Sequence, residues 1–438
     1  MAKKASKSAI GIVNAITQAT NAVAATQLPF VNKATFSDFG KQLAVAPDVY
    51  RNGWIDNLVN LCGLQVILGK RMYESYFKKL YREPTLTENI ALYMVDAIKA
   101  KAYDKEATSR ILENEPPRVG VQYIQSVLKR QYQVTDIEDL LTSAFTSEGA
   151  FLSFVDAVTT QLYSSMEDDN VEMVKEMLNQ NIAEGNIRLE VITRPDTKDQ
   201  LLAFMRKVKT IGSDWSVERS RKYNLAGFRT FSPMSDHYFL MNTDMDALNE
   251  VYNLPFAFNQ DYLQMKSEGQ AIVMGSEGLG DVYSMMVDRD FFQIRDRVNH
   301  PRFTSFFNPA TLAQNRFLTC FTVLSVAFFA NAVAFVDPSK VAGSVTATLA
   351  ARDGSAAMNP GEEKEIYVSQ IQTNGGLFDK FGTYSVSGAS TLAAGTEIDP
   401  DSGVLTVGEG EQNTALTVTW TSHLDNSVTA TIQITVNN

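Results

Sequence analysis

Few side chains in this sequence are suited to nucleophilic, acid–base or metal chemistry. The chain of 438 residues has two cysteines, Cys62 and Cys320, and three histidines, His237, His300 and His423, all far apart in the sequence. Two cysteines in unrelated contexts cannot form a disulfide framework or a thiolate zinc site. His300 has no serine, cysteine or aspartate at the spacing of a catalytic triad. The sequence therefore predicts no catalytic, cofactor-binding or metal-binding residues.

Two other motifs have the residue types that bind phosphate or calcium. The glycine-rich run 275–280 lacks the Lys-Ser/Thr pair of a phosphate-binding loop and precedes a strand, so we interpret it as a flexible loop. Asp399, Asp401 and the Glu362–Glu363 pair offer oxygen atoms, the ligands that calcium prefers. The run Asp-Pro-Asp-Ser-Gly at 399–403 is also typical of a turn between strands. The sequence favours the turn and leaves calcium binding open.

Charged residues alternate in sign between positions 288 and 297. The members of this cluster are Asp288, Arg289, Asp290, Arg295, Asp296 and Arg297. Such a cluster could bind a phosphate or a metal ion, but alternating charges more often form salt bridges, so we predict that these six residues contact a neighbouring subunit. The most basic stretch, Arg206–Arg229, favours a solvated or subunit-facing surface over nucleic-acid binding. The whole chain has a net charge of −11, whereas a general DNA-binding protein needs a basic face.

The elements that position these residues alternate between helix and strand. After Glu148, apolar residues recur every three or four positions, which predicts a long helix over about 148–182. Beyond it we expect strands at 187–193, 237–241 and 282–287, separated by a helix that begins near 196 and a second one over 244–252.

Two more helices are predicted upstream of the long one. Thr85 and Glu88 match a capping box, which predicts a helix that continues through Ile98. A second amphipathic helix is expected to begin near Trp54 and to end near Tyr81.

The run 317–336 contains twenty residues without a charge, which is the length of a membrane span. It is rich in β-branched and aromatic residues, and Ala330-Asn331 could form a bend between two strands. Strands that are buried on both faces also appear as continuous apolar runs. We therefore predict a buried apolar hairpin, with a membrane span as the alternative.

Two segments are predicted to extend away from the body. Lys3, Lys4 and Lys7 precede an uncharged stretch, 8–32, which is too polar for a secretory leader. We interpret this end of the chain as a mobile or partner-ordered arm. Residues 112–135 mix polar and apolar side chains without a helical stripe, which is typical of a projecting hairpin.

The composition changes after the Pro-containing segment 337–340. Short alternating segments near 345–350, 365–368, 404–407, 416–420 and 428–436, with turn residues between them, predict a small β-sandwich. Three basic and eleven acidic residues follow position 342, so this module has a charge of −8 and the rest of the chain −3. The linker and the charge difference suggest a separable, acidic module.

Several segments of the body resemble tailed-phage major capsid proteins, which have the HK97-like fold. The resemblance to the closing part of that fold lies in Asp281–Arg297, Phe306–Pro309, and Asn315–Phe317 with the apolar run after it. Leu240–Tyr252, followed by Phe256–Asn259, resembles the strand and helix that precede this closing part. The helix after Gly149 resembles the spine helix, and Tyr132–Phe145 resembles the return strand of the extended loop.

The tail is similar to a different family. The segment Ile398–Val407 resembles part of a bacterial immunoglobulin-like (Ig-like) domain of group 2. A capsid body with that appendage most closely resembles the major head proteins of phi29-like podoviruses.

The resemblance implies an α+β fold with an N-terminal arm (1–45), an HK97-like capsid body (46–337) and an Ig-like β-sandwich (342–438). Within the body it implies an extended loop at about 108–135, a spine helix at about 148–182, an axial-type domain at about 187–316, and a peripheral domain.

The same resemblance implies a structural protein and not an enzyme. Many copies would form hexamers and pentamers of an icosahedral or prolate head that encloses double-stranded DNA, with scaffolding and portal proteins as partners. Assembly would take place in the host bacterial cytoplasm, and the protein would remain in the virion. Lys3, Lys4 and Lys7 would face the genome, and the Ig-like domain would be accessible to a head fibre or the host surface. The lysine–asparagine pair that cross-links some relatives cannot be matched, so no cross-link is predicted.

Two other functions stay open at this point. A surface adhesin could be anchored in a membrane by residues 317–336 and use the β-sandwich as its binding module. An intracellular enzyme is also conceivable, but no sequence feature supports a site for it.

Overall fold

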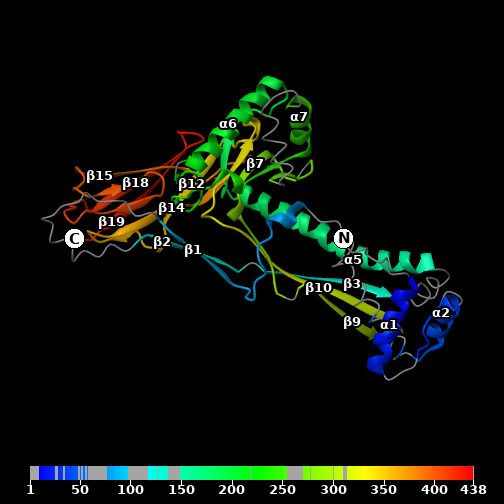
Figure 1. Ribbon diagram of the computed structural model, residues 1–438. Helices are drawn as coiled ribbons and strands as arrows, with labels where there is room; N and C mark the ends of the chain where they lie inside the picture. Colours follow the sequence, from blue (N-terminus) through cyan, green and yellow to red (C-terminus); the bar gives the residue numbers. More distant parts are fainter. Residues whose placement is uncertain are drawn as a thin grey trace, which may run out of the picture.

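The computed structural model shows an elongated molecule, with helices near the N-terminus at one end and a β-sandwich at the other (Figure 1). The structure describes residues 9–24, 28–32, 35–47, 50, 53–54, 57, 76–96, 117–125, 127–136, 148–217, 219–253, 270–276, 278–298, 300–308 and 313–437. Side chains in 148–162 and at a few other helix and strand positions are outside this description.

A long helix lies along an antiparallel sheet in the middle of the molecule (Figure 1). The helix is α5 (Glu148–Ala183), which confirms the predicted helix. Its buried residues Val174, Leu178 and Ile182 recur every four positions, so one face of the helix enters the core. The sheet has β10 (Ala313–Val326) paired with β3 (Val127–Asp136), β8 (Phe292–Asp296) and β9 (Arg302–Asn308).

A second, five-stranded sheet forms the core of the next layer. Its order is β4 (Arg188–Val191), β11 (Ala332–Val336), β7 (Val282–Asp288), β5 (His237–Met241) and β6 (Ala271–Val273). Every position of β7 is buried, as expected for a central strand. Helix α6 (Lys198–Val217) packs on this sheet through Phe204, whose ring meets those of Tyr283 and Phe335 edge-on. Helix α7 (Thr243–Asn253) follows β5, so the predicted alternation of strand and helix is confirmed.

The apolar run 317–336 forms strands, but it is not a hairpin. Its two halves, β10 and β11, pair with different neighbours and belong to different sheets. The bend near Asn331 is as predicted, and the apolar side chains are needed because both strands cross the interior of the subunit. None of the helices in the described part of the chain is both long and apolar enough to cross a membrane.

The helix predicted from Thr85 and Glu88 is wrong, because Ile90–Val95 is a strand, β1. The backbone N–H of Thr85, which a capping-box glutamate would bind, donates instead to the carbonyl oxygen of Asp296. The carboxylate of Glu88 pairs with Lys129 and Arg297, both of which lie far from it in the sequence. Of the helix expected between 54 and 81, the described part at its end is a 3-10 helix, Tyr76–Leu80.

The start of the chain is more ordered than an extended arm. Residues Ala9–Ala24 form helix α1, so the extended conformation expected over 8–32 is wrong for these residues, and Phe36–Val45 form helix α2. The side chain of Asn14 donates to the carbonyl of Val31 and accepts from its N–H, and Asn21 does the same with Leu28. The polar residues that excluded a secretory leader therefore hold the returning segment against α1. Lys3, Lys4 and Lys7 are outside the described residues.

The C-terminal module consists of two facing four-stranded sheets, as the alternation of its residues predicted. One contains β12 (Val345–Ala351), β14 (Glu363–Thr373), β17 (Val404–Thr406) and β16 (Glu397–Ile398). The other contains β13 (Ala357–Met358), β19 (Thr429–Val436), β18 (Ala415–Ser422) and β15 (Gly382–Gly388). Both sheets contribute side chains to one core around the fully buried Trp420.

Candidate assembly surfaces

The strand pair β1–β2 has an apolar face whose large side chains are exposed in the described part of the chain. Strand β2 (Val119–Ile124) pairs antiparallel with β1, and the register places Ala91 opposite Tyr123, Tyr93 opposite Val121, and Val95 opposite Val119. These six residues share one face, which we call the outer face. Tyr93 and Tyr123 are 68% and 70% exposed, and the three valines are 40% exposed or more.

The opposite face of this pair is attached to the body. The side chain of Gln122 donates to the carbonyl oxygen of Val326 (2.8 Å) and accepts from the N–H of Phe328 (2.9 Å). A Cβ atom at Gly120 would lie 2.6 Å from the ring of Phe228, so only glycine fits there. The attachment fixes which face of the strand pair points away from the subunit.

The extended loop predicted near 108–135 is therefore divided between two sheets. Strand β2 pairs with β1, whereas β3 pairs with β10 over ten residues within the body. The projecting pair thus includes Ile90–Val95, which the sequence had assigned to a helix. Residues 97–116, which connect β1 to β2, are outside the described part of the chain.

Two members of the predicted subunit-contact cluster are used inside the subunit. The buried carboxylate of Asp288 accepts hydrogen bonds from Ser232 Oγ and from the N–H of Asp290 (2.6 Å), and burial raises its pKa. Asp296 accepts a hydrogen bond from Thr322 Oγ1 (2.9 Å), and burial raises its pKa as well.

The other four members lie nearer the surface and do not pair with one another. Asp290 pairs with Arg82 (2.6 Å), and Arg297 pairs with Glu88 (3.3 Å). Arg295 donates to Gln293 Oε1 (3.2 Å), and Arg289 is exposed. Sequence reasoning missed Arg82 and Glu88 because more than 200 residues separate them from their partners.

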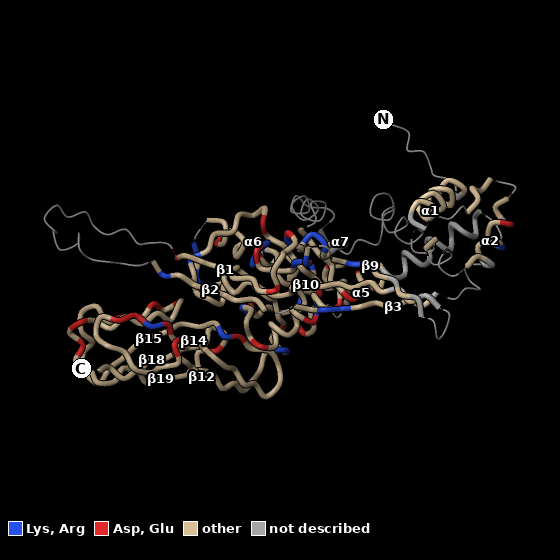
Figure 2. Tube along the Cα trace, turned by 90° about the horizontal axis from the view of Figure 1, so that it is seen from below, with Lys and Arg blue, Asp and Glu red and all other residues tan. Residues whose placement is uncertain are grey.

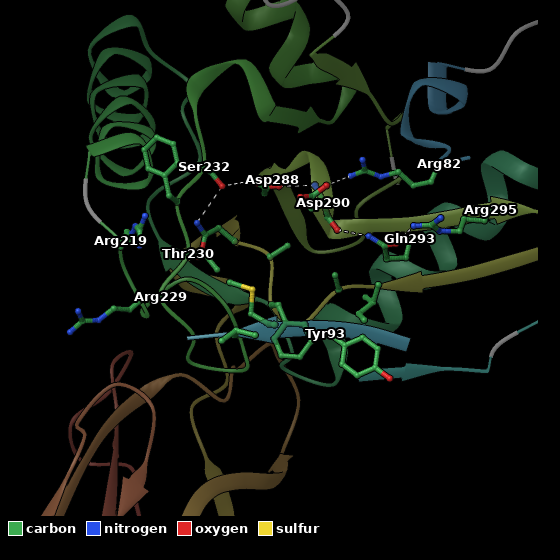
Figure 3. A pocket seen from close by; sticks show the side chains of 18 residues that line it. Arg82, Tyr93, Arg219, Arg229, Thr230, Ser232, Asp288, Asp290, Gln293 and Arg295 are labelled. Atoms are coloured by element: carbon green, nitrogen blue, oxygen red, sulfur yellow. Dashed lines mark hydrogen bonds and ion pairs between the residues drawn. The ribbon is translucent and has the colours of Figure 1, made fainter. Parts of the chain in front are cut away.

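Arginines surround a cavity of about 560 Å³ beside β1. Arg82 and Arg295 lie on one side of it, and Arg219 and Arg229 lie on the other (Figure 3). Tyr93 of the outer face also lines this cavity. The residues of the basic stretch 206–229 therefore do not form one surface. Arg219 and Arg229 line this cavity, whereas Arg221 pairs with Asp96 and Asp399, and Lys207 pairs with Glu190.

Two of the candidate calcium ligands have other partners. Asp399 Oδ1 accepts the N–H groups of Asp401 and Ser402, which confirms the predicted turn, and its other oxygen pairs with Arg221. The carboxylate of Glu362 binds the backbone and side chain of Asn359. Within the described ranges, no group of three or more His, Cys, Asp or Glu side chains is placed to hold a metal ion.

Each histidine makes a packing or hydrogen-bonding contact. His237 is buried against Trp215, which lowers its pKa, and it hydrogen-bonds with the carbonyl oxygen of Ser232. His300 stacks on Phe321, and His423 hydrogen-bonds with Asp379 (2.8 Å). The geometry of these side chains therefore serves the fold.

Comparisons with known proteins assign this architecture to a family. The family model described as Phi29-like phage major capsid protein matches residues 13–336. The major capsid protein of Bacillus phage B103 is 27% identical over 405 residues, which cover 92% of this chain and 87% of that protein. The corresponding protein of Bacillus phage PZA is 28% identical over the same length and coverage.

Solved capsid structures are also similar to this chain. That of Staphylococcus phage Andhra has a TM-score of 0.44 and 11% identity, covering 61% of this chain and 85% of that one. That of the cyanophage P-SCSP1u has a TM-score of 0.40 and 9% identity, covering 62% and 90%. Because the family model matches well over half of the residues, the chain belongs to the Phi29-like phage major capsid proteins, which are self-associating structural proteins of the virion and not enzymes.

Proposed function

We propose that the outer face of β1–β2 lies on a neighbouring copy of the chain in the shell. The observation that carries this proposal is the row of exposed tyrosines and valines on one face of the strand pair. Monomeric proteins rarely expose contiguous apolar patches of this kind, and a strand pair alone is marginally stable in water. Fully burying one large apolar side chain contributes about 1.5–3 kcal/mol, so these residues offer several kcal/mol toward association.

The finer architecture belongs to the same proposal. A long helix on one sheet, a second sheet covered by helices, and a projecting strand pair are the parts expected of an HK97-like body. The two-sheet module is proposed to be Ig-like and to lie on the outside of the shell. The charge of −8 on the module supports a position outside the shell, because the phosphates of packaged DNA would repel it (Figure 2).

The proposed assembly contains hexamers and pentamers of this chain around double-stranded DNA. Scaffolding and portal proteins are the proposed partners during assembly in the host cytoplasm, and a head fibre or host surface is the proposed contact of the module. Lys3, Lys4 and Lys7 are proposed to face the genome through weak, non-specific attraction to phosphate. Arg289 and Arg295 are the members of the charged cluster proposed to reach a neighbouring subunit, since Asp288 and Asp296 are used internally.

The substitution Tyr93→Glu tests the outer face. A glutamate at the centre of an apolar contact must lose its hydration, so we expect the yield of sedimenting particles to fall at least about tenfold while the subunit keeps its melting temperature. The matched control is Leu202→Glu on α6, which is 43% exposed and lies on a different face of the body. Particle yields, measured by sedimentation and electron microscopy, that are equal for the two variants would contradict the proposal.

A further inference from the structure

The C-terminal sandwich is attached to the body by buried polar contacts as well as by its linker. Asp379, which is fully buried, accepts a hydrogen bond from the backbone N–H of Leu189 in β4 (2.6 Å). The neighbouring Lys380 donates from its backbone to the carbonyl oxygen of Gly185 (3.0 Å) and from Nζ to Asn186 Oδ1 (2.8 Å). These contacts give the module a defined position on the body.

Two glycines allow the backbones of body and module to approach closely. A Cβ atom at Gly185 would lie 2.8 Å from the carbonyl oxygen of Phe378, and one at Gly227 would lie 2.9 Å from the Cα of Ser402. Both glycines have positive φ angles, 71° and 62°, which other residues rarely adopt. The close fit supports a fixed docking of the module.

A charged cluster joins the module to the base of the strand pair. Asp96, directly after β1, is 7% exposed and lies between Arg221 (2.7 Å) and Arg118 (3.7 Å). Each arginine also contacts an acid of the module, Arg221 with Asp399 and Arg118 with Glu365 (3.5 Å). We call these five residues the Asp96 cluster.

The body contributes to the same point. Arg118, directly before β2, donates to the carbonyl oxygens of Ala226 (3.2 Å) and Gly227 (3.0 Å), and its guanidinium lies 4.2 Å from the centre of the Phe228 ring. Both ends of the connection between β1 and β2 are therefore held. Asp96 pairs with Arg221 of the body, and Arg118 contacts Glu365 of the module and backbone carbonyl oxygens of the body.

Farther along, a cavity of about 600 Å³ lies between β2 and the module. It is lined by residues 119–122 of β2 and by Tyr367 and Tyr384 of the module, and the outer-face valines among them stay exposed. Figures 1 and 2 show β2 running beside the sandwich. The contact of the strand pair with the module is thus concentrated in the Asp96 cluster.

We propose that the C-terminal sandwich acts within its own subunit to fix the angle of the β1–β2 pair. This inference rests on the proposed contact of the outer face with a neighbouring copy, since the angle then determines where that face lies. Charged pairs with low exposure are screened little by salt and are sensitive to geometry, so they suit a fixed support. The body holds the pair through Gln122 and the close packing at Gly120, and the module adds a second support at the base, where local opening would begin.

The test is amide hydrogen exchange on the full-length, unassembled protein. The double variant Asp399→Asn/Glu365→Gln removes both module charges from the Asp96 cluster, and the amide oxygen introduced at position 399 can still accept the hydrogen bonds of the 399–403 turn. We expect exchange in β1 and β2 to become about tenfold faster while β18 and β19 keep their protection. The matched control, Glu397→Gln/Glu409→Gln, removes two exposed charges from the same module.

Exchange in β1 and β2 that is equal in the double variant and the control would overturn the inference. Loss of protection in β18 and β19 would also overturn it, because the two acids would then stabilise the sandwich itself. The particles give a separate readout: we expect the double variant to assemble into shells with a broader range of diameters. If Tyr93→Glu assembles normally while the double variant speeds exchange, the support by the module stands and the proposed neighbour contact fails.

Discussion

At the scale of single residues, Asp288 shows that a charge in an alternating cluster can be internal. Burial raises its pKa, although the hydrogen bonds from Ser232 and the Asp290 N–H lower it. An acid with a raised pKa in the folded state loses stability as pH rises from the unfolded pKa, near 4, through the folded value. We therefore expect the melting temperature of Asp288→Asn, relative to that of wild type, to increase from pH 4 to pH 8. At pH 8 it should be about 2–4 °C higher than that of wild type. In thermal melts, a gain that is absent at pH 8, or equal to that of Asp290→Asn, would contradict this.

At the scale of elements, α5 is held by the apolar face that its sequence spacing predicts. Leu178 is fully buried in the core shared by the helix and the sheets, so we expect Leu178→Ala to lower the free energy of unfolding by about 2–5 kcal/mol. The exposed Glu176, on the other side of the helix, provides the control, and Glu176→Ala should change it by less than about 0.5 kcal/mol. Equal effects of both variants in denaturant titrations would show that this face is not the buried one. Phe154 is one of the apolar residues that recur along the predicted helix, but its side chain is not among those that the structure describes.

At the scale of the whole molecule, the module is docked on the body and is not joined to it by the linker alone. Buried Asp379 and the close approach at Gly185 couple the sandwich to the body, so we expect full-length protein to unfold in one calorimetric transition. A chain that ends at 341 should melt several degrees lower, because Leu189 loses its hydrogen bond and the docking surface becomes exposed. Two transitions, one of them equal to that of the truncated chain, would contradict this coupling.

The family assignment also decides between the functions that the sequence left open. Residues 317–336 form two strands in two sheets, and the family consists of capsid proteins, so the membrane-anchored adhesin is overturned. The enzyme alternative has no support, because the chain belongs to a family of structural proteins.

The elements whose pattern is local could be predicted from the residues alone. The spacing in α5, the alternation in β18 and β19, and the apolar run of β7 specify helix or strand because neighbouring side chains must reach one core face. The wrong helix at 85–98 had a correct local motif. It failed because Thr85 and Glu88 bind residues about 40 to 210 positions away, which no short-range pattern contains.

The exposed face of the strand pair and the contacts at its base follow only from the way distant segments pack together. The outer face arises from pairing β1 with β2, and the Asp96 cluster brings together five residues that are separated by up to about 300 positions in the sequence. Whether such a charge is buried, paired or exposed depends on which segments meet around it. That depends on the packing of the whole chain, because the free energy of a charge is set by its surroundings and not by its neighbours in the sequence.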